Sequence, residues 1–237
     1  MSIRRWHLVV ASALTFVLAS EAAAQFRPPA GVITPEANNR QTAGMLQREF
    51  DNDRLMEEPE AAARLHKNAT SIAKCMVRRG RSSAGGYVGG VLAGDPGYER
   101  IGDALTGRLQ ACAASNAAAT AIAISGALAE ELVRAKVPQL ADRAPTVDED
   151  DARRFFGDLS GAVTLDNVAG CLAVYSPGLA YKVLAAPVGS AEETAALEAV
   201  FKQTPECGMA APPTSLPSLY QRGALATALY KWTSPAA

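Results

Sequence analysis

Histidine, aromatic residues and net charge are all scarce in this chain. Its 237 residues include 2 histidines and 6% aromatic residues, and the formal net charge is −1. So few histidines exclude most catalytic triads and zinc sites, which take their general base or their ligands from imidazole. The lack of a basic excess argues against a dedicated nucleic-acid-binding protein. Hydrophobic residues still make up 49% of the chain and charged residues 20%, so we expect a folded protein with its own core.

The common catalytic and cofactor motifs are also missing. The chain has no Gly-x-Ser-x-Gly sequence and no Cys-x-x-Cys pair. A glycine-rich segment, residues 85–90, lacks the glycine order of a dinucleotide fingerprint and the Lys-Ser/Thr end of a phosphate-binding loop. The sequence therefore predicts no cofactor and no metal centre.

Residues 1–24 have the three parts of a secretory signal peptide. Arg4 and Arg5 give a positive start, residues 8–19 are apolar, and residues 22–24 form a small-residue cleavage site. The apolar stretch is too short to span a bilayer, which needs roughly 20 residues. We therefore expect cleavage near Gln25, no transmembrane segment in the mature chain, and a periplasmic or secreted location.

All four cysteines, Cys75, Cys112, Cys171 and Cys207, lie beyond this leader. An even number of cysteines in an exported chain favours disulfide bonds. Four cysteines allow three pairings, and their number does not choose among them. Their spacing is more informative, because 37 positions separate the first two cysteines and 36 positions separate the last two.

A second repeated feature follows each pair of cysteines. Residues 126–134 read Gly-Ala-Leu-Ala-Glu-Glu-Leu-Val-Arg, and residues 223–231 read Gly-Ala-Leu-Ala-Thr-Ala-Leu-Tyr-Lys. Together with the cysteine spacing, this indicates a tandem duplication and predicts one disulfide in each repeat, Cys75 with Cys112 and Cys171 with Cys207. Gly126 and Gly223 start the matching segments. Since glycine costs a helix about 1 kcal/mol, we expect them to allow close approach of a neighbouring backbone.

The apolar periodicity predicts an all-α fold made of two tandem related helical repeats. The expected order is a mobile lead-in at 25–58, repeat 1 at 59–137, a linker with a short helix at 138–159, and repeat 2 at 160–237. The first helix is expected from Pro59 to Gly80. Capping signals mark further helix starts: Asp95 before Pro96, Thr146 with Glu149, and Ser190 with Glu193. Expected apolar helix faces include Ile101, Leu105, Leu109 and Cys112 on one helix, and Leu225, Leu229 and Trp232 on the last.

Three residues, His66, Glu130 and Glu131, are catalytic candidates. His66 lies between Leu65 and Lys67, which favours a solvent-exposed helix position. Glu130 and Glu131 are also expected on an exposed helix face, because the matching positions of the second repeat are not acidic. The alternative is that such acids serve a carboxylate-dependent hydrolase of envelope substrates.

Cationic residues are concentrated in the first repeat. Residues 59–137 carry ten positive and six negative side chains, whereas residues 160–237 carry four and five. Lys74, Arg78, Arg79 and Arg81 form the main cluster. Two interpretations stay open: these cations offset the dipole of a helix C-terminus, or they bind an anionic envelope surface or an envelope protein.

A cysteine-bearing helix, the segment 189–193, a second cysteine and the segment 222–230 form one pattern in the second repeat. With this pattern, the chain from about Ile72 to Trp232 resembles an uncharacterised family of secreted alphaproteobacterial proteins with a duplicated two-cysteine helical unit. The resemblance implies export but no particular activity. The first copy differs from the pattern, because Ser125 stands where the second copy has Arg222. Arg222 is therefore a candidate partner-binding residue of the second copy only.

The sequence as a whole predicts a noncatalytic exported protein that has an interaction or structural role in the cell envelope. Export, duplication and the missing catalytic sets point to this function.

Overall fold

Helices form nearly all the regular structure in the part of the chain that the computed structural model describes, residues 32–33, 52–90, 95–113, 119–134, 140, 149–156 and 164–234. The exception within these residues is one short antiparallel pairing, Val32–Ile33 (β1) with Ala119–Thr120 (β2). The all-α prediction is therefore confirmed. The expected signal peptide at 1–24, and most of the expected lead-in and linker, lie outside the described residues.

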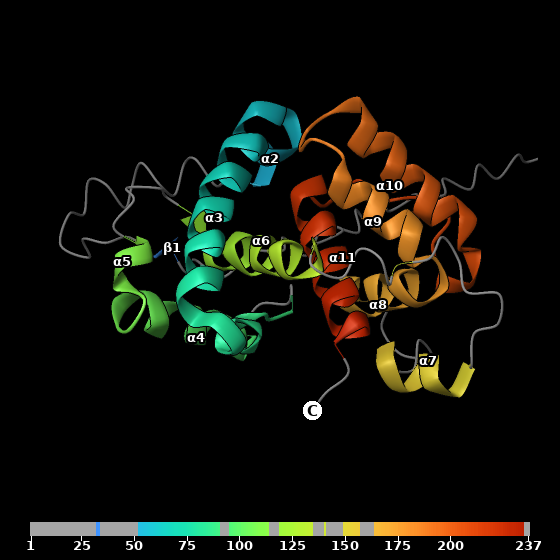
Figure 1. Ribbon diagram of the computed structural model, residues 1–237. Coiled ribbons are helices and arrows are strands. Elements are labelled where there is room, and N and C mark those ends of the chain that lie inside the picture. The colour runs from blue at the N-terminus through green and yellow to red at the C-terminus, as the bar shows by residue number, and fades with distance from the viewer. Residues whose placement is uncertain are drawn as a thin grey trace, which may run out of the picture.

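The helices fall into two groups along the chain. The N-terminal group consists of α2 (Asn52–Glu57), α3 (Pro59–Gly80), the 3-10 helix η1 (Arg81–Tyr87), α4 (Pro96–Thr106), α5 (Gln110–Ala113) and α6 (Ala121–Arg134). The C-terminal group consists of α7 (Glu149–Phe156), α8 (Leu165–Tyr175), α9 (Pro177–Ala185), α10 (Ala191–Gln203), the 3-10 helix η3 (Pro205–Cys207) and α11 (Ser218–Thr233). Figure 1 shows α6 and α11 side by side in the middle, with α3 to α5 on one side and α8 to α10 on the other.

Two disulfides hold these groups, with the pairing that the spacing predicted. Cys75–Cys112 joins α3 to α5 with a Cα–Cα distance of 5.5 Å, and Cys171–Cys207 joins α8 to η3 with a distance of 5.6 Å. Each bond closes a loop within its own group. In the chain-entropy model, a disulfide that closes a loop of this length stabilises the folded state by up to about 4 kcal/mol.

The predicted helix starts agree well with the structure. α3 runs from Pro59 to Gly80, as expected, and its apolar face is buried. Asp95 caps α4 by accepting a hydrogen bond from the backbone N–H of Gly97, and Ser190 caps α10 by accepting one from that of Glu193. α7 begins at Glu149, while its expected cap at position 146 lies outside the described residues.

Two details of the expected apolar faces were wrong. Leu109 and Cys112 do not continue the face of α4, because Gly107 leaves the helical conformation (φ −110°, ψ −118°) and the chain turns into α5. Both side chains are buried nevertheless. Trp232 is 37% exposed, and its ring packs edge-on against Phe155 of α7 with centroids 5.6 Å apart.

The crossing of α6 and α11 joins the two groups. Gly126 and Gly223 meet there, and a Cβ atom placed on Gly126 would lie 2.8 Å from the Cα of Gly223. The expected close backbone approach is therefore confirmed, and the neighbouring backbone belongs to the matching glycine. This approach brings polar side chains of α6 and α11 within contact distance.

No single helix among the described residues is both long and apolar enough to cross a bilayer. Only α8 and α9 taken together meet that length and composition, and their axes turn by 110° at the break between them.

Candidate functional site

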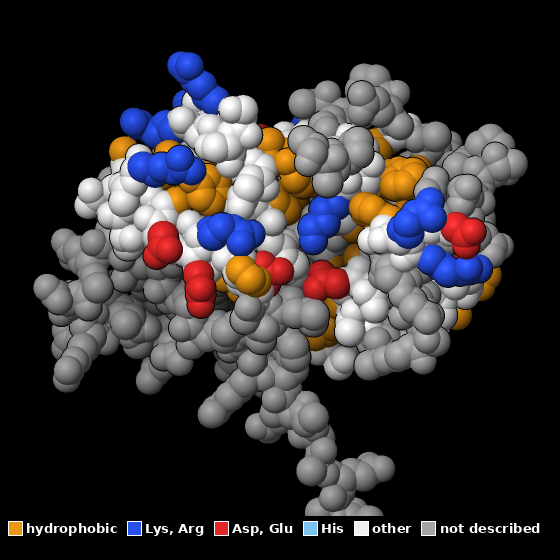
Figure 2. Space-filling view, turned by 90° about the horizontal axis from the view of Figure 1, so that it is seen from below, with side chains coloured by type: hydrophobic (Ala, Val, Ile, Leu, Met, Phe, Trp, Pro, Cys, Tyr) orange, Lys and Arg blue, Asp and Glu red, His pale blue; other side chains and the backbone are white. Residues whose placement is uncertain are grey.

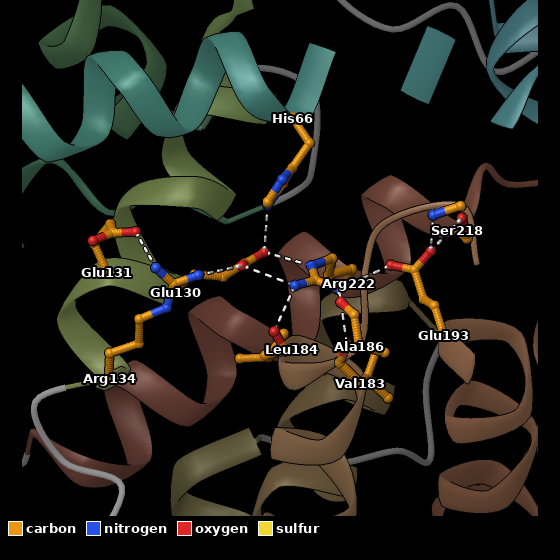
Figure 3. Close-up of polar contacts among 11 residues, drawn as sticks. His66, Glu130, Glu131, Arg134, Val183, Leu184, Ala186, Glu193, Ser218 and Arg222 are labelled. Carbon is orange, nitrogen blue, oxygen red and sulfur yellow. Dashed lines mark hydrogen bonds and ion pairs between the residues drawn. The ribbon is translucent and has the colours of Figure 1, made fainter. Parts of the chain in front are cut away.

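The most extensive polar site is a buried ionic network centred on Arg222 of α11 and Glu130 of α6. Both residues are buried, with 2% and 3% exposure. Arg222 donates two hydrogen bonds to the carboxylate, from Nε to Oε1 at 2.7 Å and from Nη2 to Oε2 at 3.1 Å. Figure 3 shows this two-pronged pair at the junction of the two helix groups. The pair therefore connects the groups by charge as well as by packing.

The other guanidinium hydrogens of Arg222 also have acceptors. They reach the backbone carbonyl oxygens of Val183 (2.8 Å), Leu184 (2.6 Å) and Ala186 (2.9 Å), and Oε1 of Glu193 (3.0 Å). These carbonyls belong to the C-terminal end of α9, which carries the negative end of the helix dipole. Arg222 is therefore enclosed and fully hydrogen-bonded, and the interpretation that it contacts an external partner was wrong.

Glu193 belongs to the same network and to the start of α10. Its Oε2 accepts hydrogen bonds from the backbone N–H of Gly189 at 2.8 Å and from the Ser218 hydroxyl at 3.4 Å. Its own N–H donates to the Ser190 hydroxyl at 3.1 Å. The predicted capping box is present, with the carboxylate returning to Gly189 and not to Ser190. A helix-capping residue thus doubles as a counter-ion of Arg222.

His66 and Glu130 do not lie on exposed helix faces as predicted. The Nε2 atom of His66 lies 3.1 Å from Oε1 of Glu130, and the His66 side chain is 15% exposed. Glu130 is buried because α6 packs between α3 and α11, which covers the face on which it lies. Its neighbour Glu131 is closer to solvent and forms an ion pair with Arg134 at 2.6 Å.

The electrostatics keep both central groups charged. Burial on its own raises the pKa of the Glu130 carboxyl, but the hydrogen bonds from His66 and Arg222 outweigh burial and hold this pKa below its ordinary value. Burial likewise lowers the pKa of Arg222, while the bonds and charges of Glu130 and Glu193 reverse that effect and raise it. An ionised carboxylate cannot donate the proton that glycoside hydrolysis needs from its general acid.

The space next to this network is too small for a substrate. A cavity of about 10 Å³ lies against His66, Glu130, Gly126 and Gly223. Such a volume holds about one water molecule. The network is therefore a structural link between the two helix groups, and its geometry does not favour the hydrolase alternative.

A second candidate site is a hollow lined by arginine side chains at the end of α3. Its volume is about 530 Å³, and its charged lining consists of Arg78, Arg79, Arg81 and Arg108. We call it the arginine hollow. It brings together three of the five predicted binding residues with Arg108, which lies after α4. Sequence reasoning missed Arg108, because nothing in the chain links it to residues about thirty positions earlier.

Lys74 lies apart from the arginine hollow. It lines a neighbouring depression of about 340 Å³ with Ser71, Val77, Arg78 and Glu131. A carboxylate therefore shares the depression of Lys74, whereas no acidic residue from the described part of the chain lines the arginine hollow. The face shown in Figure 2 carries lysine and arginine side chains in separate groups, with apolar atoms between them.

The arginines of the hollow are held in different ways. Arg108 lies over the ring of Tyr87, 5.3 Å from its centroid, and donates to the Tyr87 hydroxyl. Arg78, Arg79 and Arg81 form no ion pair within the described part of the chain. Arg81 has φ 47°, and it is the only non-glycine residue with positive φ among the residues described. Such a backbone conformation is strained for a residue with a side chain and is often found at functional sites.

No family model, curated protein or solved structure matches this chain. The family resemblance seen in the sequence therefore stays an expectation. Among the described residues, no group of three or more His, Cys, Asp or Glu side chains is arranged to hold a metal ion.

Proposed function

We propose that this chain is a noncatalytic exported protein of the cell envelope, and that the arginine hollow binds an anionic envelope component. The observation that carries the proposal is the convergence of Arg78, Arg79, Arg81 and Arg108 on one hollow, to whose lining the described residues contribute no carboxylate. Four cations at one place repel one another unless an anion joins them. The dipole at the end of α3 offsets only part of that charge.

Phosphate groups on lipid headgroups are the anions that this site suits best. Guanidinium groups match phosphate oxygens with paired, parallel hydrogen bonds, which a lysine cannot form. The strained conformation of Arg81 also fits a binding role. A glycine would adopt this conformation without strain but would carry no charge, so the arginine keeps a cation at the hollow at the cost of backbone strain. We therefore propose an anionic lipid surface as the partner.

Export is proposed from two independent features. Residues 1–24 carry the pattern of a signal peptide. The two disulfides indicate an oxidising compartment outside the cytosol, since thiols stay reduced inside it. A periplasmic or secreted protein meets envelope lipids directly.

We also propose that the two helix groups descend from one duplicated unit. Gly126 and Gly223 lie 97 positions apart and touch each other, as equivalent residues do at a two-fold axis. Ser125 forms a hydrogen bond with the backbone of Gly89, and Arg222 forms one with the backbone of Ala186. Arg222 lies 97 positions after Ser125, and Ala186 lies 97 positions after Gly89, so the two contacts join equivalent positions. These parallels support the duplication, and the arginine hollow then belongs to one copy only.

Co-sedimentation with lipid vesicles tests the proposed function. The oxidised protein is expected to bind phosphatidylglycerol vesicles at low salt, to bind phosphatidylcholine vesicles weakly, and to dissociate at high salt. The variant Arg79→Ser/Arg81→Ser should lose about thirtyfold in affinity, at about 1 kcal/mol for each cation. The matched control Lys67→Ser/Lys182→Ser removes the same charge from two other exposed positions. Equal losses in both variants, or no binding to phosphatidylglycerol, would refute the role of the hollow.

A further inference from the structure

A separate groove of about 620 Å³ lies between the two helix groups, where α2 and the start of α3 face α10 and the segment 208–217. Its volume is within the range of about 300–1,000 Å³ that is typical of ligand sites. Its lining is mostly apolar and includes Leu55, Met56, Leu197 and Pro213. Met56 is 44% exposed there, and its flexible thioether adapts to different apolar partners. The groove is thus shaped and lined for an apolar ligand.

Gln221 of α11 supplies a polar group at the wall of this groove. Its side-chain amide nitrogen donates to the carbonyl oxygens of Pro213 and Leu216, both at 2.9 Å, which fixes the orientation of the amide. Its Oε1 atom is buried and has no hydrogen-bond partner among the described residues. Since buried acceptors are costly when unpaired, this atom favours a ligand that brings an N–H or O–H donor.

The other polar groups of the groove indicate which kind of ligand this is. Glu198 and Lys202 lie on α10, while Thr214 lies in the segment opposite, so donors and acceptors are distributed along the groove. A fatty acyl chain has its polar atoms at one end only. An extended peptide offers N–H and C=O groups along its whole length, with side chains alternating between them.

We propose that this groove binds a short, extended, apolar peptide segment of a partner protein, with one peptide N–H donated to Oε1 of Gln221. Because Oε1 is buried, a peptide N–H can reach it only after the atoms that cover it move aside. This proposal does not depend on the arginine hollow, which has a different lining.

Selection from a random heptapeptide library on the oxidised protein provides the test. Enriched apolar peptides are expected, and fluorescence anisotropy with the synthetic peptides then measures their affinity. Ala211→Arg places a long side chain in the groove and should weaken binding at least about tenfold. Ala185→Arg makes the same change at the end of α9, away from the groove, and should leave binding unchanged. Both alanines are exposed, so both variants should keep the circular dichroism spectrum and melting temperature of the parent protein.

Methylating the peptide nitrogens one at a time tests the bond to Gln221. One position should lose about tenfold in affinity, because its methyl group removes the hydrogen that Oε1 accepts. A peptide unaffected at every position, or unaffected by Ala211→Arg, would overturn the proposal. So would a failure to enrich apolar peptides, and decanoate binding that Ala211→Arg abolishes would then assign the groove to lipid.

Discussion

Gly126 and Gly223 form a close backbone contact between α6 and α11, and the contact is not symmetric. A Cβ atom on Gly126 would lie 2.8 Å from the Cα of Gly223, whereas a Cβ atom on Gly223 would lie 3.5 Å from the Cα of Gly126. A Cβ atom added at Gly126 would therefore clash with the backbone of α11, whereas one added at Gly223 would make an ordinary van der Waals contact. This asymmetry makes two otherwise identical substitutions distinguishable.

We expect Gly126→Ala to lower the free energy of unfolding by about 1–3 kcal/mol, which is typical of overpacking against a backbone that cannot move away. Gly223→Ala is the matched control. It should leave stability unchanged or raise it by up to about 1 kcal/mol, because alanine favours helix more than glycine does. Urea unfolding followed by circular dichroism measures both. Equal effects of the two substitutions would contradict the contact.

Removing the charge of Glu130 should destabilise the protein far more than removing that of Glu131. Glu130→Gln leaves Arg222 buried with one carboxylate partner fewer, and we expect a loss of about 3 kcal/mol. Glu131→Gln breaks an ion pair with the 45% exposed side chain of Arg134 and should cost less than about 1 kcal/mol. Thermal unfolding of the two variants provides the comparison. A Glu130 variant as stable as the Glu131 variant would show that the network contributes little.

The pH dependence of stability should carry the signature of Glu130. Its pKa in the folded state lies below the ordinary value of 4.5, so the unfolded chain takes up this proton first as the pH falls. The stabilisation is fully present above pH 4.5 and is lost as the pH falls from there through the folded-state pKa. Urea unfolding between neutral pH and about pH 3 should show a shallower loss for Glu130→Gln than for the parent protein. Parallel pH profiles would contradict this account.

Substituting Arg81 should separate stability from binding. Arg81→Gly relieves the strain of φ 47° and should raise the free energy of unfolding by about 1 kcal/mol, while weakening binding to phosphatidylglycerol vesicles. Arg79→Gly removes the same charge from within α3 and should lower stability by about 1 kcal/mol instead. Chemical unfolding and co-sedimentation of both variants measure the two effects. A destabilised Arg81→Gly protein would mean that the conformation is not strained.

The sequence predicted the features that depend on neighbouring or regularly repeated residues. The helix α3 could be predicted because its apolar residues recur at helical spacing and Pro59 marks its start. The caps at Asp95 and Ser190 depend on contacts two or three residues away. The disulfide pairing followed from nearly equal spacing, and the close backbone approach at Gly126 and Gly223 followed from the recurrence of glycine at a costly helix position. That the two glycines meet each other was visible only in the structure.

The candidate sites depended on contacts that no local pattern contains. Glu130 and Arg222 lie 92 positions apart, and their charges alone predict solvent exposure. The packing of α6 between α3 and α11, and of the end of α9 against Arg222, buries them, and their burial is tolerated because both charges have partners there. In the same way, Arg108 joins the arginine hollow because α4 and α5 fold back beside the end of α3. Helix periodicity and cysteine spacing thus determined the elements and their covalent links, whereas long-range packing decided which charges were buried and which surrounded a hollow.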